Sequence, residues 1–251
     1  LARFGIYAGG LAGAIGAGLA QVHPALVLAL ATVCFTFAAF AGLGLPNPRA
    51  EADAAPAETR PAPSREAFAQ QQRSLRLSRL ATAVVRLLNG FLVALLAFEF
   101  KEGGSALDFG TLIGAAGIGF GLASVISPWL ERHVREEPMV VAALALEAAA
   151  AFVTGQFFGL GTAAALAGAA GLAWGTAKFG FDGLQQAVTH PAQRGGAFTR
   201  AETLFQLAWV VGAVIPVGLP IAAEVGLAIA GVVALAAQTV FVAGLLVEPH
   251  R

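Results

Sequence analysis

The chain has 251 residues, of which 57% are hydrophobic and only 12% are charged, and its mean hydropathy is +0.75. This composition excludes an ordinary soluble domain and favours an all-α integral membrane protein. The 15 basic and 15 acidic residues cancel, so the net charge gives no reason to expect a nucleic-acid partner. The one cysteine, Cys34, excludes an internal disulfide and a thiolate metal cluster.

Long apolar runs recur along the whole chain. A helix needs about 20 apolar residues to cross a hydrocarbon core of about 30 Å. By this criterion we expect eight transmembrane helices, of which the fifth is the shortest. They cover residues 2–21, 24–45, 80–100, 106–130, 138–154, 157–185, 202–220 and 225–246.

A polar connection, residues 46–79, separates the first two spans from the last six. It is rich in Pro, Ala, Arg and Glu and too poor in large apolar residues to form a core. From residue 64 onward the composition favours a helix, which could lie on the inner leaflet or extend the following span into solvent. We therefore expect two spans in residues 1–45, a linker in 46–79 and a six-helix bundle in 80–248.

The basic residues predict the orientation of these spans. When the spans are threaded alternately, 14 of the 15 Lys and Arg residues fall on one side of the membrane, and only Lys101 falls on the other. Cytoplasmic loops carry the excess of Lys and Arg. We therefore expect the linker, the turns at 131–137 and 190–200 and both chain ends to be cytoplasmic. The Arg-, Ala- and Gly-rich composition points to the cytoplasmic (inner) membrane of a GC-rich bacterium.

Small residues predict where helices approach closely, because lipid supplies no hydrophobic force that drives helices together. The first span carries glycines at intervals of four, and two further spans are dense in glycine. The glycines concerned are Gly5, Gly9 and Gly13, then Gly114, Gly117, Gly119 and Gly121, and finally Gly159, Gly161, Gly168 and Gly171.

The segment 189–216, THPAQRGGAFTRAETLFQLAWVVGAVIP, is similar to the inside turn and eleventh helix of bacterial permeases of the major facilitator superfamily. In that turn an Arg-Gly pair, here Arg194 and Gly195, follows a proline. Arg132 and Arg135 stand where the family repeats a basic inside-loop motif. Two spans, a basic linker and six spans together resemble the fifth to twelfth helices of such a transporter.

The resemblance implies secondary active transport of a small solute across the membrane by alternating access. A proton is the expected coupling ion, and export is favoured over import. The expected partners are therefore the lipid bilayer, the solute and H⁺, without a cofactor. The resemblance also implies four helices before residue 1, so we expect the chain to be an N-terminally truncated piece of the transporter.

Polar residues at membrane depth are the candidate site residues, because an ionised side chain there costs about 2.5–3.5 kcal/mol and normally faces a partner or water. Trp174, Lys178 and Asp182 share one face of the sixth expected span, as Glu202, Gln206 and Trp209 do on the seventh. The resemblance implies that these two spans border the central cavity. The predicted cavity residues are Asn89, Trp174, Gln206 and Trp209.

Charged residues near the inner end of the bundle form a predicted inside gate or charge network, comprising Arg86, Lys178, Asp182, Arg194, Arg200 and Glu202. In the plainer alternative, Lys178 and Asp182 only neutralise each other as an intrahelical ion pair. Glu147 and Glu99 are candidate protonation sites. For Glu147, the position in the span favours a protonated, hydrogen-bonded structural role, with proton transfer as the alternative.

An enzymatic function finds little support in the sequence. There is no HExxH motif and no glycine-rich phosphate loop, and the four histidines lie in four separate turns or tails. We therefore expect a transporter and not an enzyme. The alternatives are a non-transporting membrane subunit, or an intramembrane enzyme that uses polar residues such as Glu147 and Asp182.

Overall fold

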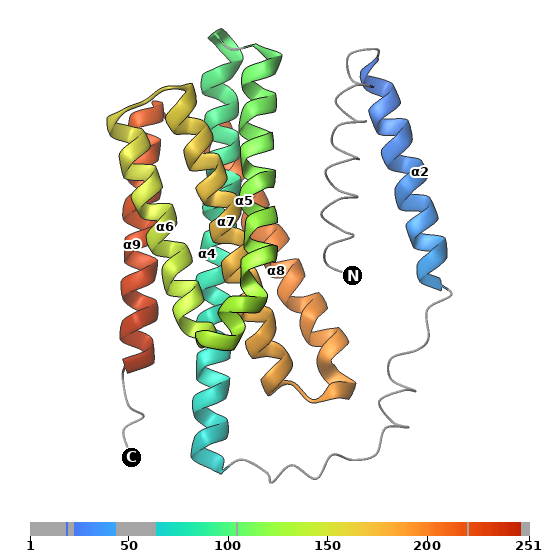
Figure 1. Cartoon of the computed structure of the whole chain (residues 1–251), viewed down its shortest axis with the longest axis vertical. Coiled ribbons are helices and arrows are strands. Elements are labelled where there is room, and N and C mark those ends of the chain that lie inside the picture. The colour runs from blue at the N-terminus through green and yellow to red at the C-terminus, as the bar shows by residue number, and fades with distance from the viewer. Residues whose placement is uncertain (1–18, 20–22, 44–63, 104, 220, 247–251) are drawn as a thin grey trace. The chain divides into compact units, whose positions relative to one another are not determined.

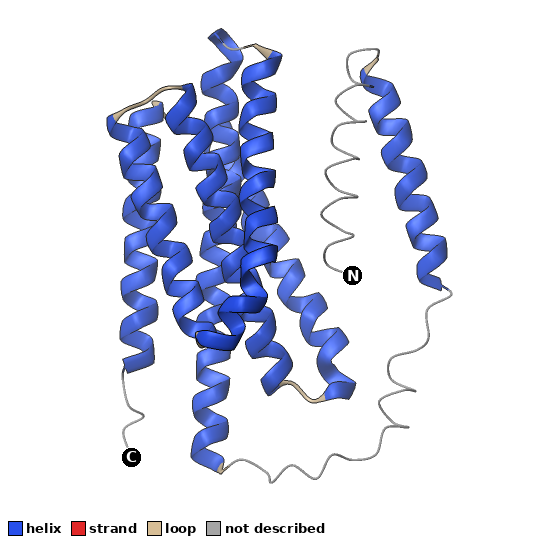
Figure 2. Cartoon of the chain, viewed as in Figure 1, coloured by secondary structure: helices blue, strands red, loops and turns tan. Residues whose placement is uncertain are grey.

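The computed structural model describes residues 19, 23–43, 64–103, 105–219 and 221–246 (Figure 1). The described part is all-helical, with seven helices and no strand (Figure 2). The chain forms two compact units, Leu1–Thr59 and Arg60–Arg251. In the first unit, α2 (Pro24–Leu43) occupies the second expected span. Apart from Leu19, the first expected span and its glycines lie outside the described residues.

The second unit is a bundle of six helices joined by short turns. Each of the six is long and apolar enough to cross a membrane, which is the arrangement of a multi-pass membrane protein. Their bounds are α4 (Arg65–Gly103), α5 (Ala106–His133), α6 (Glu136–Gln156), α7 (Leu160–Val188), α8 (Pro191–Gly218) and α9 (Ala223–Leu246). The fifth expected span, which appeared short, is a helix of 21 residues.

Two helices begin earlier than the apolar runs predict. α4 is continuous from Arg65, where the Ser64 hydroxyl accepts the Ala67 N–H at 3.2 Å. The basic stretch is therefore an extension of the span. α8 begins at Pro191, so the expected turn at 190–200 is wrong for all but its first residue. Proline suits the first turn because no helical partner awaits its missing N–H, and the His190 ring accepts the Ala192 N–H at 3.4 Å.

The helices α5 and α7 pack backbone to backbone through glycines. A Cβ added at Gly119 would collide with the carbonyl oxygen of Gly168, and one at Gly171 with the carbonyl oxygen of Ala116. The predicted close packing is thus confirmed at these three glycines. It is wrong for Gly114, Gly117, Gly159 and Gly161 within the described part of the chain, where nothing lies within 4 Å of an added Cβ.

The helices α4 and α8 meet in the same way. A Cβ at Gly90 would collide with the carbonyl oxygen of Trp209, and one at Gly212 with that of Leu87. The two helix pairs are equivalent residue by residue. Gly90 and Gly171 lie 81 residues apart, as do Leu87 and Gly168; Gly119 and Gly212 lie 93 apart, as do Ala116 and Trp209.

The six helices therefore form two repeats, α4–α6 and α7–α9. In this correspondence α4 is equivalent to α7, α5 to α8 and α6 to α9. The contact of α5 with α7 is therefore equivalent to that of α8 with α4, and the contact of α6 with α7 to that of α9 with α4. All four contacts are present. Successive helices alternate in direction and each repeat has three, so the second repeat is inverted relative to the first. Asn89 and Ala170 are equivalent positions of the two repeats, because they are 81 residues apart. They meet where α4 contacts α7, and the Asn89 amide donates to the Ala170 carbonyl at 3.3 Å.

The basic residues of the described bundle gather at one end. This end contains the start of α4, the α5–α6 turn and the α7–α8 turn (Figure 1). Lys101 belongs to the last turn of α4, at the opposite end. The alternate threading inferred from the charges is thus present in the six helices of the bundle.

Candidate functional site

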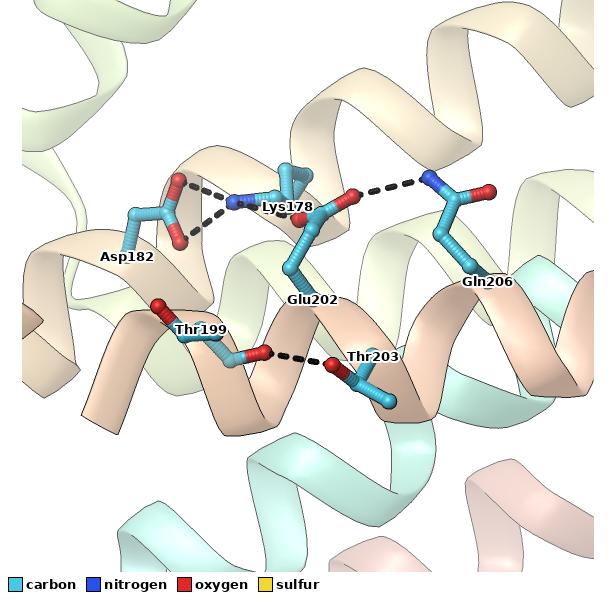
Figure 3. A network of polar contacts seen from close by, with 6 residues as sticks. All are labelled: Lys178, Asp182, Thr199, Glu202, Thr203 and Gln206. Carbon is cyan, nitrogen blue, oxygen red and sulfur yellow. Dashed lines mark hydrogen bonds and ion pairs between the residues drawn. The ribbon is translucent and has the colours of Figure 1, made fainter. Parts of the chain in front are cut away.

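A polar network joins α7 to α8 (Figure 3). The Lys178 ammonium donates to both carboxylate oxygens of Asp182, at 2.7 and 2.5 Å, one helical turn away. It also lies 3.7 Å from a carboxylate oxygen of Glu202 on α8. The other oxygen of Glu202 accepts the Gln206 amide at 2.9 Å. The intrahelical pair predicted from the spacing is therefore one part of an interhelical network.

Arg86 of α4 approaches this network between two indoles. Its guanidinium carbon lies 4.5 Å from the ring centre of Trp174 and 5.8 Å from that of Trp209. Such cation–π contacts contribute about 0.5–2 kcal/mol each. Within the described part of the chain no hydrogen bond or ion pair holds the guanidinium, and its Nε is buried without a partner.

An aromatic wall fixes the orientation of Trp174. The ring of Trp174 meets the edge of Phe205, with ring centres 5.7 Å apart and planes at 80°. Phe205 in turn meets Phe181 edge-on at 5.3 Å. Both phenylalanines are fully buried. Because packed side chains have few rotamers to choose from, the indole beside Arg86 is preorganised.

We call the seven side chains that line this part of the bundle the polar face, namely Arg86, Trp174, Lys178, Asp182, Glu202, Gln206 and Trp209. With 29 residues, α7 is about 43 Å long, so if centred it extends about 7 Å beyond each boundary of a 30 Å core. Lys178, ten residues before Val188, then lies about 8 Å below the boundary, and Trp174 about 14 Å below it. The polar face thus extends to about the midplane.

The polar face is open on its α8 side. The side chains of Lys178 and Asp182 are 19% and 23% exposed, whereas that of Glu202 is 45% exposed. Glu202 and Gln206 also line a surface depression along α8, whose other lining residues are Phe198, Thr199, Thr203, Leu207 and Val210. A solute in this depression would meet the carboxylate and the amide before the deeper indoles.

Asn89 and Glu147 form a second polar contact, away from the polar face. The Asn89 amide donates to Glu147 at 3.2 Å and to the backbone carbonyls of Val85 and Ala170, at 3.2 and 3.3 Å. Glu147 is fully buried, and its second carboxylate oxygen has no partner in the described structure. Burying an unpaired charge costs several kcal/mol, so this site suits a neutral carboxylic acid.

The remaining predicted residues lie apart from the network. Arg194 caps the end of α7, donating to the carbonyls of Thr189 and Gln186 at 3.2 and 3.0 Å. Arg200 is exposed on α8, and Glu99 is exposed near the end of α4. Among the described residues, none of these three forms an ion pair with the polar face.

A buried polar stripe on α4 was not singled out from the sequence. Ser74, Ser78 and Thr82, spaced by four, all face the bundle interior. The Ser74 hydroxyl donates to Glu137 of α6 at 2.9 Å. Spacing by four was the available signal, but short hydroxyl side chains are common in membrane helices, where they bond to their own backbone.

No family model, curated protein or solved structure matches this chain. The polar face, the Asn89–Glu147 contact and the inverted repeats are therefore the observations from which function is argued.

Proposed function

We propose that this chain is part of a bacterial secondary active transporter of the major facilitator superfamily, which moves a small solute across the cytoplasmic membrane by alternating access. The observation that carries the proposal is that α4 of the first repeat and α7 and α8 of the second together form the polar face. Substrate sites of secondary transporters lie near the midplane at such repeat interfaces. Arg86 comes from the first repeat, and the two indoles beside it come from the second.

Alternating access also needs contacts that break without great cost. The Lys178–Glu202 contact, at 3.7 Å with a half-exposed carboxylate, is of this kind, since exposed ion pairs contribute about 0–1 kcal/mol. The glycine contacts of α4 with α8 and of α5 with α7 are rigid by comparison. We infer that the gate opens by separating Lys178 from Glu202 while these helix pairs move as units.

Proton coupling needs an acid that exchanges its proton between states. Glu147 is the candidate, because it is fully buried and contacts α4 through Asn89. A shift of α4 against α6 would break this hydrogen bond and change the environment of the acid. Outward transport with proton return is the favoured direction.

Sided cysteine labelling tests the proposal without a known solute. In a Cys34→Ser background, Gln206→Cys is placed on the polar face, while Ser105→Cys and Arg194→Cys mark the two ends of the bundle. Each variant is treated with a membrane-impermeant maleimide in right-side-out and in inverted vesicles. We expect the two end markers to label in opposite preparations and Cys at 206 to label in both. If position 206 labels from one side only or from neither, alternating access is refuted in favour of a non-transporting subunit or an enzyme.

A further inference from the structure

Arg86 indicates what kind of solute the polar face binds. We propose that the solute is an amphipathic organic anion whose carboxylate, or other oxyanion, pairs with Arg86 and whose apolar part packs against Trp174 and Trp209. This inference rests on the proposed transport function for its biological meaning. The binding site itself is argued from the contacts of Arg86 alone.

The first observation is that the two cations of the polar face, Lys178 and Arg86, differ in the number of acceptors that bond to them. Lys178 has a carboxylate at both 2.5 and 2.7 Å, and a second carboxylate at 3.7 Å. The guanidinium of Arg86 carries five N–H donors, yet no acceptor bonds to it in the described residues. A cation at membrane depth normally faces a partner or a water-filled cavity. Among the charged groups of the polar face, the guanidinium is thus the one to which no acceptor of the described residues bonds, which favours an anionic ligand.

The nearest anion does not fill this role. Glu202 is close enough to Arg86 to act on it electrostatically, but it forms no direct ion pair with it. Its two oxygens are directed to Gln206, at 2.9 Å, and to Lys178, at 3.7 Å. A cationic solute would have to compete with both of these groups for Glu202. An anionic solute would meet no competing acceptor at Arg86.

The second observation is the aromatic setting of the guanidinium. An arginine that lies over an indole keeps its N–H groups, which radiate in its own plane, available for a bidentate oxyanion. Trp174 and Trp209 also supply apolar surface on both sides of the charge. A ligand with an apolar ring next to an oxyanion would satisfy the indoles and the guanidinium together.

Three dansyl compounds of different charge test the inference on the full chain in detergent. Dansylglycine carries a carboxylate, dansylamide is neutral and dansylcadaverine carries an ammonium group. Energy transfer from tryptophan to the dansyl group reports binding, because two of the three tryptophans lie at the site. We expect saturable transfer with dansylglycine only. It should fall in Trp174→Phe and stay unchanged in Trp129→Phe, whose indole lies beside His133 at the end of α5.

Substitutions of Arg86 then assign the binding charge. Loss of charge-assisted hydrogen bonds in Arg86→Gln should weaken dansylglycine binding about ten- to a hundredfold. The affinity of Arg86→Lys for dansylglycine should lie between that of Arg86→Gln and that of the wild type. Arg79→Gln, an exposed arginine of the same helix, is the matched control and should bind normally. If Arg86→Gln does not fold, Arg86→Lys carries the comparison. In Glu202→Gln, removal of the neighbouring carboxylate should tighten binding a few-fold.

The outcomes separate this inference from the proposed transport. Equal transfer from all three compounds, or undiminished dansylglycine binding in both Arg86 variants, overturns the anion site. If the anion site is overturned in this way but position 206 labels in both vesicle preparations, the transport proposal stands without the anion site. If dansylglycine binding depends on Arg86 while position 206 labels from one side only, the anion site stands and the transport proposal falls.

Discussion

Substitution of Gly119 by alanine should destabilise the bundle, because the added methyl group has no space. The new Cβ would collide with the carbonyl oxygen of Gly168 on α7. Backbone atoms cannot rotate away as a side chain can, so α5 and α7 have to separate by about 1 Å, which forfeits about a quarter to a half of the dispersion energy between the facing atoms. Overpacking of this kind costs about 1–3 kcal/mol.

Gly114→Ala on the same helix is the matched control. No described residue has an atom within 4 Å of a Cβ at Gly114, and alanine favours a helix over glycine by about 0.5–1 kcal/mol. We expect the control to unfold at the wild-type temperature or slightly above it, and Gly119→Ala several degrees below it. The assay is size-exclusion chromatography of detergent-solubilised protein after stepwise heating. Equal stability of the two variants would refute the backbone contact between α5 and α7.

Two further predictions concern the polar contacts. Lys178→Met leaves the Asp182 carboxylate unpaired and should cost about 1–2 kcal/mol, between the values for exposed and for buried pairs. The double variant Lys178→Met with Asp182→Asn should recover most of that loss in the same heating assay, and additive losses would contradict the pair. Glu147→Gln keeps an acceptor for Asn89 and should be nearly as stable as the wild type. Asn89→Leu removes the only donor to Glu147 in the described structure and should cost about 1–3 kcal/mol; the reverse order of stabilities would exclude a neutral Glu147.

Helical spacing predicted the contacts within one helix but not those between helices. Lys178 and Asp182 are four residues apart, so their pairing follows from the geometry of α7 alone. Arg86 meets Trp174 and Trp209 only because α4 packs against both α7 and α8. A tertiary contact of this kind leaves no local signal in the sequence.

Glycine density has the same limit. It predicted that α5 packs closely, but it could not say which glycines face a neighbour. Gly114 and Gly119 are five residues apart, about 140° around the helix axis, so only one of them can face α7.

The start of α8 was misplaced for another reason. Arg194 and Arg200 indicate a turn by their charge, whereas Pro191 and the His190 ring let a helix begin before them.

The repeat register pairs residues near one end of the bundle with residues near the other end. The offset of 81 residues carries Trp174 and Lys178 of α7 onto Val93 and Ala97 of α4, and the offset of 93 carries Gln206 of α8 onto Ile113 of α5. The inverted counterparts of Trp174, Lys178 and Gln206 are therefore apolar, whereas the offset of 81 carries Asp182 onto Lys101. The ion pairs of Lys178 with Asp182 and Glu202 lie toward the end where α4 begins, so if the repeats exchange conformations, closure at this end depends on charge. Salt should then weaken closure at the end where α4 begins, because screening weakens the attraction between exposed charges.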